Sequence, residues 1–294
     1  FFIYNIFNYK SLDTELKGTF IKAKVGGSFT SFAAVDGTEY DDDMQRDPDA
    51  LPRFYGFLEE GKMPATSQIN QFRYTEYFES LLKKGDVIHI AFGSGMTPSV
   101  KNAVTAAAEL HRKYPDRKII VVDSMCSSTG YGMLVDTAAD MRDAGASMLD
   151  INRYVTENRK KIHHQFFSTD LTHYKRSGRM SGPVATIASI LGICPIMRLN
   201  NAGKIIAYDK VRGKKNAIRE TVKVMEKCAA GGAEYSGKCF INHSNCLDDA
   251  LATKSAILEK FPNLTEAEIV EVEIVFFAVF PSDEAKAFFL IIKL

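Results

Sequence analysis

Two short apolar runs with similar surroundings constrain the fold of this chain most. Residues 87–92 (VIHIAF) and 118–122 (KIIVV) are continuous apolar segments with the length of buried parallel strands. Each is followed by a loop rich in glycine and hydroxyl groups, and then by a helical pattern at 98–113 and about 133–142. Because the crossover between parallel strands is right-handed, this order predicts a parallel α/β sheet.

The pattern changes after a further expected helix at about 148–161. Residues 194–199 and 204–211 flank Asn200-Asn201-Ala202-Gly203, a sequence that favours a hairpin. The remaining expected elements are strands at 163–168, 239–242, 269–277 and 287–293, a short helix and turn at 169–179, and helices at 183–192, 214–227 and 247–260. A hairpin combined with crossover units predicts a mixed sheet. We therefore expect two α/β domains, 1–160 with a parallel sheet and 161–294 with a mixed sheet.

Composition excludes several classes of protein. The chain is 46% hydrophobic and 25% charged, as in a soluble globular protein, and its net charge of +1 provides no field for nucleic acid or membranes. No apolar run reaches the roughly 18 residues of a membrane span. The opening FFIYNIFNYK lacks a basic region and a cleavage site, so we expect no signal peptide. The five scattered cysteines indicate reduced thiols and a cytoplasmic protein.

Neither a metal nor a cofactor is expected. Cys239, His243 and Cys246 lie close in sequence, but their spacing matches no common zinc pattern and no second ligand pair follows. The plainer interpretation is a strand that ends in CFINHS. The chain contains no GxxxxGK[ST] loop and no GxGxxG motif.

The loop Gly93-Ser94-Gly95-Met96 is the most informative candidate site. It lies at the carboxyl end of an expected strand and before a helix, where open α/β sheets bind ligands. Its glycines would let backbone approach a ligand, and the helix N-terminus suits an anion. Since Thr97 can cap the helix, the Ser94 hydroxyl is available to donate to a carboxylate or phosphate. An ordinary turn serine is the alternative.

Ser94 also raises the possibility of a hydrolase. The nucleophile-elbow pattern requires glycine two positions before the serine, and Phe92 stands there. An enzyme that acts on a small carboxylate or an ester remains the alternative function.

Three further segments could contribute to a site. Thr66 and Ser67, in MPATSQ, are adjacent hydroxyls in an expected exposed loop, although one residue of this loop could cap the helix 70–82. Ser127 and Ser128 lie in a small, hydroxyl-rich loop that suits a pocket wall. Arg179 stands between a glycine and an apolar helix start, where it could turn inward to an anion.

A basic segment lies at the expected strand-to-helix junction near residue 213. It contains Lys210, Arg212, Lys214 and Lys215, with Arg219 one turn further on. Cations are mildly unfavourable at a helix N-terminus, which suggests a use for the charge. A solvated face is the alternative. Across the whole chain, anion donors and abundant Phe and Ile without an obvious general base favour a protein that holds an amphiphile with one acidic end.

The order of several motifs resembles the DegV family. The motifs are ATSQ at 65–68, VIHIAFGSGMTPSVKNA at 87–103, KYPDRKIIVVDSMCSSTGYGMLV at 113–135, LTHYKRSGRMSG at 171–182, ILGICPIMRLNNAGKI at 190–205 and KVRGKKNAI at 210–218. The resemblance implies a two-domain protein, not itself an enzyme, that holds a long-chain fatty acid in an apolar tunnel between its domains. It also implies a partner fatty acid kinase, which phosphorylates the bound carboxylate with ATP, after which the binding subunit carries acyl phosphate onward.

The resemblance also assigns residues. By position, Thr66 and Ser94 would hold the carboxylate, with the amides of Gly95 and Met96 and the Ser67 hydroxyl beside them. Arg179 matches the arginine of the family's GGRI turn, although Ser177 replaces the first glycine, and the segment around Ser127 and Ser128 looks like pocket wall. Apart from the resemblance, the local density of cations predicts that the basic segment docks the acidic face of the kinase.

Both ends depart from the family. FFIYNIFNYKSLDTEL lacks the expected Asp-Ser loop, and residues 277–286 read FAVFPSDEAK where the family has Gly-x-His-x-Gly-Pro-Gly. The histidine that would assist at the carboxylate is absent.

Overall fold

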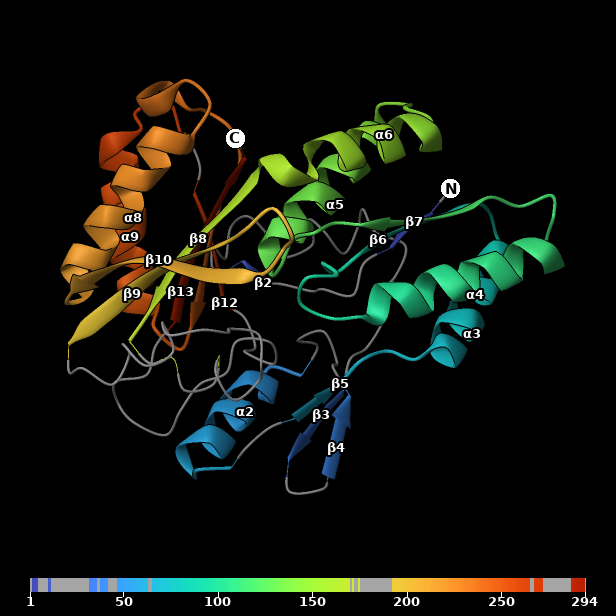
Figure 1. Ribbon diagram of the computed structural model, residues 1–294, viewed down its shortest axis with the longest axis horizontal. Helices are drawn as coiled ribbons and strands as arrows, with labels where there is room; N and C mark the ends of the chain where they lie inside the picture. Colours follow the sequence, from blue (N-terminus) through green and yellow to red (C-terminus); the bar gives the residue numbers. More distant parts are fainter. Residues whose placement is uncertain are drawn as a thin grey trace.

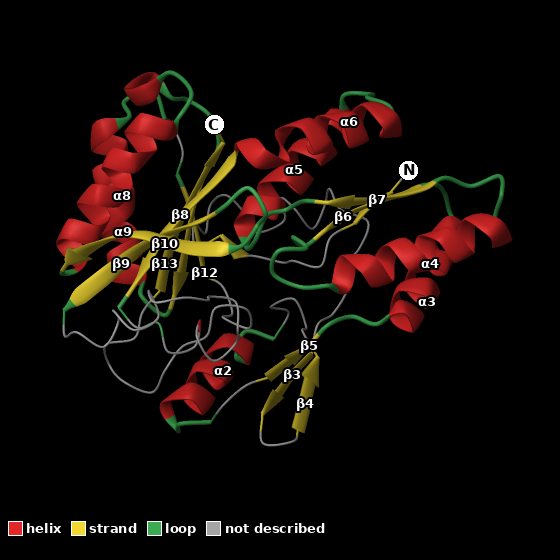
Figure 2. Cartoon of the chain, in the orientation of Figure 1, coloured by secondary structure: helices red, strands yellow, loops and turns green. Residues whose placement is uncertain are grey.

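A computed structural model describes most of the chain. The described residues are 2–4, 10–11, 32–35, 38–41, 47–62, 65–169, 171, 174, 192–264, 267–271 and 287–293. They form a parallel sheet, a large mixed sheet and a small antiparallel sheet, with helices packed against them (Figures 1 and 2). The expected helices at 169–179 and 183–192, with Arg179, fall almost entirely outside these residues.

The parallel sheet predicted from the two apolar runs is confirmed. Its described strands have the order β1 (Phe2–Tyr4), β6 (Val87–Ala91) and β7 (Ile119–Asp123), and neighbouring strands are parallel. Every residue of β6 is buried, and its side chains alternate between two apolar clusters. The helices α3 (Gln71–Leu82) and α4 (Ser99–Lys113) lie on one side, and α5 (Thr129–Asp143) and α6 (Met148–Asn158) on the other (Figure 1).

Several expected helix details are wrong. The helix expected from Pro98 begins at Ser99, although the Thr97 hydroxyl does accept a hydrogen bond from the Ser99 amide at 3.3 Å. The packed face of α4 is formed by Val100, Leu110 and small alanines, and Val104 is 51% exposed. α5 begins at Thr129, about four residues earlier than expected, because its first turn is hydrogen-bonded to the large sheet. α6 gives way to a 3₁₀ turn at Arg159–Lys161.

The mixed sheet predicted for the second half is also confirmed. Among the described strands its order is β10 (Ile205–Arg212), β9 (Ile193–Leu199), β8 (Ile162–Ser168), β13 (Ala287–Lys293), β11 (Cys239–Ser244), β12 (Glu268–Glu271) and β2 (Lys10–Ser11). β11 and β12 are parallel and the other pairs are antiparallel. The helices α8 (Lys214–Cys228) and α9 (Leu247–Lys260) cover one face (Figure 1). The division between domains near residue 160 stays a prediction.

The hairpin predicted across Asn200–Gly203 is present. Ile205 pairs with Leu199, and the register shifts between Ala207 and Asp209, so Tyr208 lies in a β-bulge. The Asn200 side chain accepts hydrogen bonds from the amides of Ala202 and Lys204, which closes the turn.

The small sheet corrects the expectation of a loop at residues 65–67. β5 (Ala65–Ser67) and β4 (Thr38–Asp41) both pair antiparallel with β3 (Phe32–Val35). The cap of the following helix is Asn70, whose side chain accepts a hydrogen bond from the Arg73 amide, so none of the residues 66–68 caps it. α2 (Ala50–Glu59) lies beside this sheet in Figure 1. None of the helices in the described part of the chain is long and apolar enough to cross a membrane.

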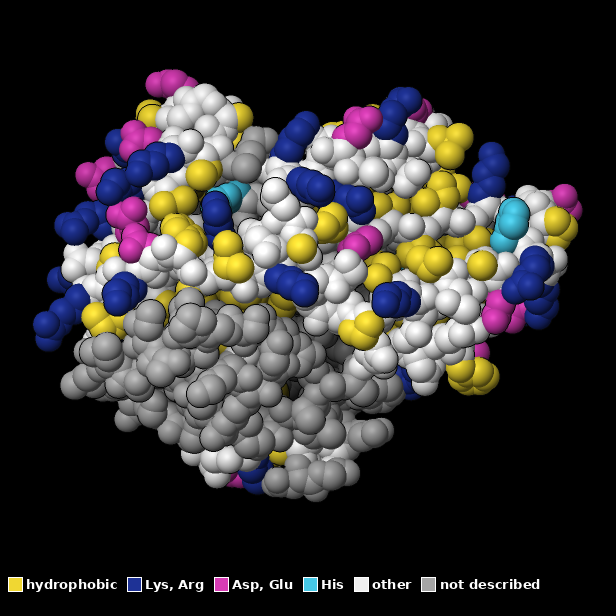
Figure 3. Space-filling view, in the orientation of Figure 1, with side chains coloured by type: hydrophobic (Ala, Val, Ile, Leu, Met, Phe, Trp, Pro, Cys, Tyr) yellow, Lys and Arg dark blue, Asp and Glu magenta, His cyan; other side chains and the backbone are white. Residues whose placement is uncertain are grey.

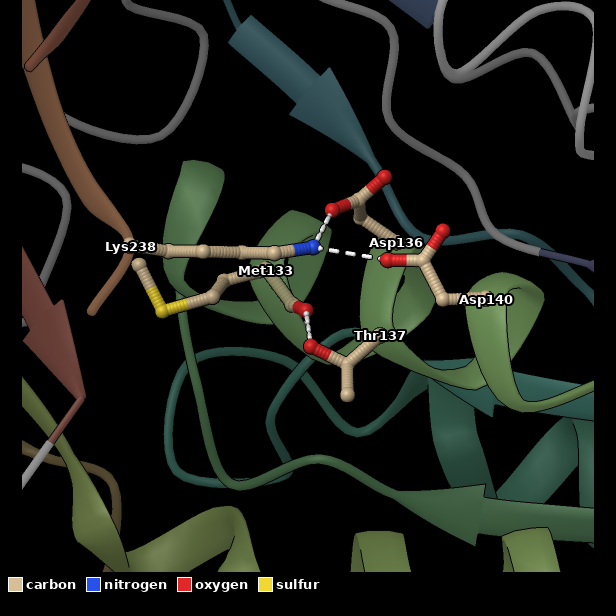
Figure 4. Close-up of polar contacts among 5 residues, drawn as sticks. All are labelled: Met133, Asp136, Thr137, Asp140 and Lys238. Atoms are coloured by element: carbon tan, nitrogen blue, oxygen red, sulfur yellow. Dashed lines mark hydrogen bonds and ion pairs between the residues drawn. The ribbon is translucent and has the colours of Figure 1, made fainter. Parts of the chain in front are cut away.

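An ion pair joins α5 to the segment that enters the large sheet. Lys238 precedes β11 and donates hydrogen bonds to the carboxylates of Asp136 and Asp140, the latter at 3.0 Å (Figure 4). Asp136 is 3% exposed. Burial alone would lower the pKa of Lys238, but the hydrogen bonds and charges of the two carboxylates raise it overall. Lys238 is thus held charged against a buried carboxylate.

We predict that Lys238→Ala lowers the free energy of unfolding by about 1–3 kcal/mol, because it leaves the Asp136 carboxylate buried without its cation. Urea unfolding curves would measure the loss. The matched control is Lys260→Ala, which breaks a partly exposed ion pair with Glu226 and should cost about 1 kcal/mol or less. Equal losses in the two variants would contradict a special role for Lys238.

Candidate functional site

The carboxyl ends of β6 and β7 carry two loops that are bound to each other. One oxygen of the Asp123 carboxylate accepts hydrogen bonds from the Ser94 amide at 3.0 Å and from the Met125 amide at 2.9 Å. The Gly93 amide donates to the Cys126 carbonyl at 2.9 Å. Ser94 itself is exposed, and Met96 is buried. These contacts fix the Ser94 loop beside the loop that leads into α5.

The two glycines of the Ser94 loop make room for protein backbone. A Cβ atom on Gly93 would lie 2.7 Å from the Cys126 carbonyl oxygen. A Cβ atom on Gly95 would clash with the Ala202 carbonyl oxygen and with Gly203, in the turn of the β9–β10 hairpin. The hairpin turn therefore packs directly on the Ser94 loop. That these glycines also let backbone approach a ligand stays a prediction.

The predicted wall residues lie deep in the molecule. Ser127 and Ser128 are 2% and 6% exposed. Ser128 has φ 51° and ψ −144°, a conformation that costs a residue with a side chain on the order of 1–3 kcal/mol. Its hydroxyl accepts a hydrogen bond at 2.8 Å from the side-chain Nδ2 of Asn242 in β11, and the Thr129 hydroxyl donates to the side-chain Oδ1 of Asn242 at 2.8 Å. The large sheet thus holds the first turn of α5.

His164 of β8 makes a second link between the loop and the large sheet. Its Nε2 atom lies 3.1 Å from the Ser127 amide nitrogen, and its Nδ1 atom lies 3.2 Å from the Ile162 carbonyl oxygen. These distances fit a neutral ring that accepts from Ser127 and donates to Ile162. Burial, with a smaller effect of His163, lowers the pKa of His164 to about 4. The close approach of Gly130 to the imidazole leaves no room for a Cβ atom there.

Two buried hydroxyls at this junction lack hydrogen-bond partners within the described part of the chain, those of Ser127 and Ser244. Lys238 binds Asp140 in the C-terminal half of α5, whereas Asn242, four residues later, binds Thr129 in its first turn. α5 and β11 therefore run in opposite directions. Ser244 lies two residues beyond Asn242 on the same face of β11. Both hydroxyls therefore lie toward the first turn of α5, where each can still donate one hydrogen bond.

One apolar cluster borders these polar groups. It includes Phe54 of α2, Phe92 and Met96 beside the Ser94 loop, and Phe166 and Met197 of the large sheet. The cluster is continuous from the parallel sheet to the large sheet. This junction therefore combines buried apolar side chains with buried hydroxyl groups.

The structure brings together only some of the predicted site residues. Ser94, Gly95 and Met96 lie beside the loop of Ser127 and Ser128, through the Asp123 and Gly93 contacts. The backbone of Thr66 and Ser67 lies in β5, and their side chains fall outside the described residues. The sequence analysis did not identify His164, Asn242 and Ser244, which also lie at this junction. They lie on strands whose sequences are typical of a buried core, and no local pattern distinguishes them.

Most of the cations of the basic segment are exposed to solvent, but one of them forms an ion pair within the protein. Lys210, Arg212, Lys215 and Arg219 are exposed. Lys214 instead forms an ion pair of 2.9 Å with Asp249 of α9. A docking role for these cations stays a prediction.

No group of three or more candidate metal ligands occurs among the residues that the structure describes. The Cys246 amide donates to Nδ1 of His243 at 3.4 Å, and both residues are buried at the end of β11. This agrees with the plainer interpretation of this segment as a strand end.

The model of the DegV family, described as an uncharacterised protein family, matches residues 33–282. The chain belongs to the DegV family. A DegV domain-containing protein of Clostridium perfringens is 38% identical over 230 residues, which cover 78% of each chain.

Solved structures of two proteins share the fold. A stearic-acid-binding protein of Eubacterium ventriosum superposes with a TM-score of 0.83 at 16% identity, covering 100% of this chain and 98% of the other. The fatty acid kinase B3 protein of Streptococcus pneumoniae, loaded with linoleic acid, superposes with a TM-score of 0.79 at 19% identity, covering 100% and 99%. At these identities the likeness establishes the fold.

We predict that acid destabilises the protein through His164. The folded-state pKa of about 4 lies below the ordinary value of 6.5, so between these values the unfolded chain binds a proton that the folded chain does not. The contribution is complete above pH 6.5 and is lost as the pH falls toward 4, by up to about 3 kcal/mol. NMR titration of the imidazole should give a midpoint near pH 4. A midpoint near 6.5 would contradict the buried, neutral ring.

We further predict that glycine is tolerated better than alanine at position 128. Ser128→Gly and Ser128→Ala both remove the hydroxyl that accepts from Asn242, but only glycine relieves the backbone strain. The glycine variant should therefore be more stable than the alanine variant by about 1–2 kcal/mol in urea unfolding. The reverse order would show that the backbone at Ser128 is unstrained.

Proposed function

We propose that this chain binds a long-chain fatty acid at the junction of the parallel and large sheets and presents its carboxylate to a partner fatty acid kinase. The chain itself would catalyse no reaction, and would carry the acyl phosphate onward. Since the kinase reaction uses ATP, the complex would work in the cytoplasm.

The observation that carries this proposal is the continuous apolar cluster that ends at buried hydroxyls. Residues from α2, the Ser94 loop and the large sheet contribute to the cluster, and Ser127 and Ser244 border it with unused donors. Each buried methylene contributes about 0.8 kcal/mol, so a 16-carbon chain would gain on the order of 10 kcal/mol before ordering costs. Apolar burial would dominate the affinity, and the head group would fix the orientation. The stearic-acid-binding protein of Eubacterium ventriosum and the linoleic-acid-loaded protein of Streptococcus pneumoniae, which share this fold, support this choice of ligand.

For the head group we propose the hydroxyls of Thr66, Ser67 and Ser94, the amides of Gly95 and Met96, and the Arg179 guanidinium. Ser94 is suited to this role because Asp123 fixes its amide and leaves its exposed side chain outside that contact. Ser127 and Ser128 would form part of the pocket wall. The Asn242 bond makes Ser128 a fixed part of that wall.

Extraction of the purified protein under denaturing conditions, followed by mass spectrometry, tests the proposed ligand directly. A long-chain fatty acid in about equimolar amount is the expected result. Protein without bound acid that fails to take up palmitate, but turns over ester substrates, would instead support the alternative of a carboxylate- or ester-processing enzyme.

For the head group, we predict that Ser94→Ala weakens palmitate binding by about 1.5–3 kcal/mol, or roughly 10- to 150-fold, because a hydrogen bond to a charged group is lost. Isothermal titration calorimetry would measure the change, and thermal stability of the empty protein should hardly alter. Ser255→Ala on the exposed face of α9 is the matched control and should bind as the parent does. Parent affinity in Ser94→Ala would remove Ser94 from the site.

For the partner surface, we propose that Lys210, Arg212, Lys214 and Lys215 dock an acidic face of the kinase. We predict that Arg212→Glu with Lys215→Glu slows phosphorylation of the bound acid, more strongly at low salt, because surface charges act mainly on association rate. Lys84→Glu with Lys101→Glu makes the same change of charge at exposed positions elsewhere and should leave the rate unchanged. Equal rates for both double variants across a salt series would contradict the docking role. Fatty-acid binding should be intact in both.

A further inference from the structure

The outer strand of the parallel sheet, β7, has an open edge. Its neighbour β6 is completely buried, whereas Ile119, Ile120 and Val121 of β7 are half-buried. No other described strand pairs with β7. Figure 3 shows hydrophobic side chains gathered along the band between α6 and α4, where β7 runs. The helices on the two sides carry the exposed Leu149 and Val104.

The sequence of β7 lacks the devices that usually protect such an edge. Proline, lysine, a bulge or an inward charge normally discourages strand pairing. The strand Ile119–Asp123 reads IIVVD, and its pairing with β6 is regular. An unprotected apolar edge of this kind is suited to pairing with another strand.

The hydrogen bonds of the sheet determine which backbone groups point outward. The Val87 amide donates to the Lys118 carbonyl, and the Ser124 amide donates to the Ala91 carbonyl. Even-numbered residues of β7 therefore face β6, and Ile119 and Val121 direct their N–H and C=O groups to the open side. At the end of the strand the Asp123 carbonyl accepts from Arg159 at 2.7 Å, which closes the edge there.

We propose that β7 pairs antiparallel with β7 of a second copy of this chain, about a two-fold axis at Ile120. Opposed residues in an antiparallel pair must both point toward each other, so Ile119 and Val121 can only face odd-numbered partners. With the axis at Ile120, Ile119 faces Val121 of the second copy, and Val121 faces Ile119 of the second copy. The two residues of each pair exchange backbone hydrogen bonds. The same register sets Arg117 opposite Asp123, a cation opposite a carboxylate.

The neighbouring register is less favourable. An axis at Val121 would place the apolar Ile119 opposite the charged Asp123. The axis at Ile120 instead sets apolar residues opposite each other and Arg117 opposite Asp123. The Asp123 carbonyl accepts from Arg159 and takes no part in the pairing in either register. The contact is isologous, so it closes as a dimer and does not propagate.

Disulfide trapping of the full-length chain tests the register. At the axis, Ile120 and its symmetry mate form a non-hydrogen-bonded pair with Cα atoms about 4.5 Å apart, within disulfide range. Ile120→Cys should therefore give a covalent dimer under mild oxidation. Lys118→Cys is the matched control, because positions 118 of the two copies would lie about 13 Å apart. The parent supplies the background, since four of its five cysteines are buried and Cys228 is partly buried. Equal cross-linking in the two variants would overturn the register.

Sedimentation equilibrium of the unmodified chain tests the association itself. A monomer–dimer equilibrium is expected, and Arg117→Glu should raise the dissociation constant about tenfold, because it places two carboxylates opposite each other. Lys118→Glu makes the same change of charge on the other face of the sheet and should have a several-fold smaller effect. A chain that stays monomeric at about 1 mM would overturn the proposal, as would equal effects of the two charge reversals.

Discussion

The buried hydrogen bonds at the first turn of α5 are the contact on which the arrangement of this protein depends. Asn242 of β11 bonds to both Ser128 and Thr129, and His164 of β8 bonds to Ser127. These bonds connect a helix of the parallel sheet to the large sheet. Because buried polar groups are costly when unpaired, the two sheets can separate only by exposing or orphaning all of these groups together.

The same hydrogen bonds fix the positions of the hydroxyl groups at the first turn of α5. α5 is buried on nearly all sides in its first half, so it forms part of the core between the sheets as well as the end of a strand–loop–helix unit. Its first turn sets hydroxyls beside an apolar cluster to which both sheets contribute. Strain at Ser128 is tolerated because Asn242 holds the side chain and the surrounding core fixes the backbone. Rigid hydroxyls next to apolar surface are what binding an acyl chain with a fixed orientation requires.

Much of the fold follows from local patterns in the sequence. The apolar runs of β6 and β7, the Asn-rich turn before β10 and the helix Leu247–Lys260 are each determined by nearby residues, and each was predicted in type and position. Contacts between distant segments were not predictable in this way. The early start of α5 depends on Asn242, more than 100 residues away, and the burial of alanines in α4 in place of Val104 depends on packing against α3. Sequence motifs pointed to the Ser94 and Ser127 loops, whereas His164 and Ser244 become candidates for the site only through the contacts of the large sheet with α5.

A crystal structure of the protein grown with palmitate would show whether an acyl chain lies in this junction with its carboxylate at the Ser94 loop. We expect a carboxylate within about 3 Å of the Ser94 hydroxyl and an acyl chain in contact with the cluster of Phe166 and Met197. Palmitate bound with its carboxylate away from the Ser94 loop, or an acyl chain bound outside the junction of the two sheets, would contradict this expectation.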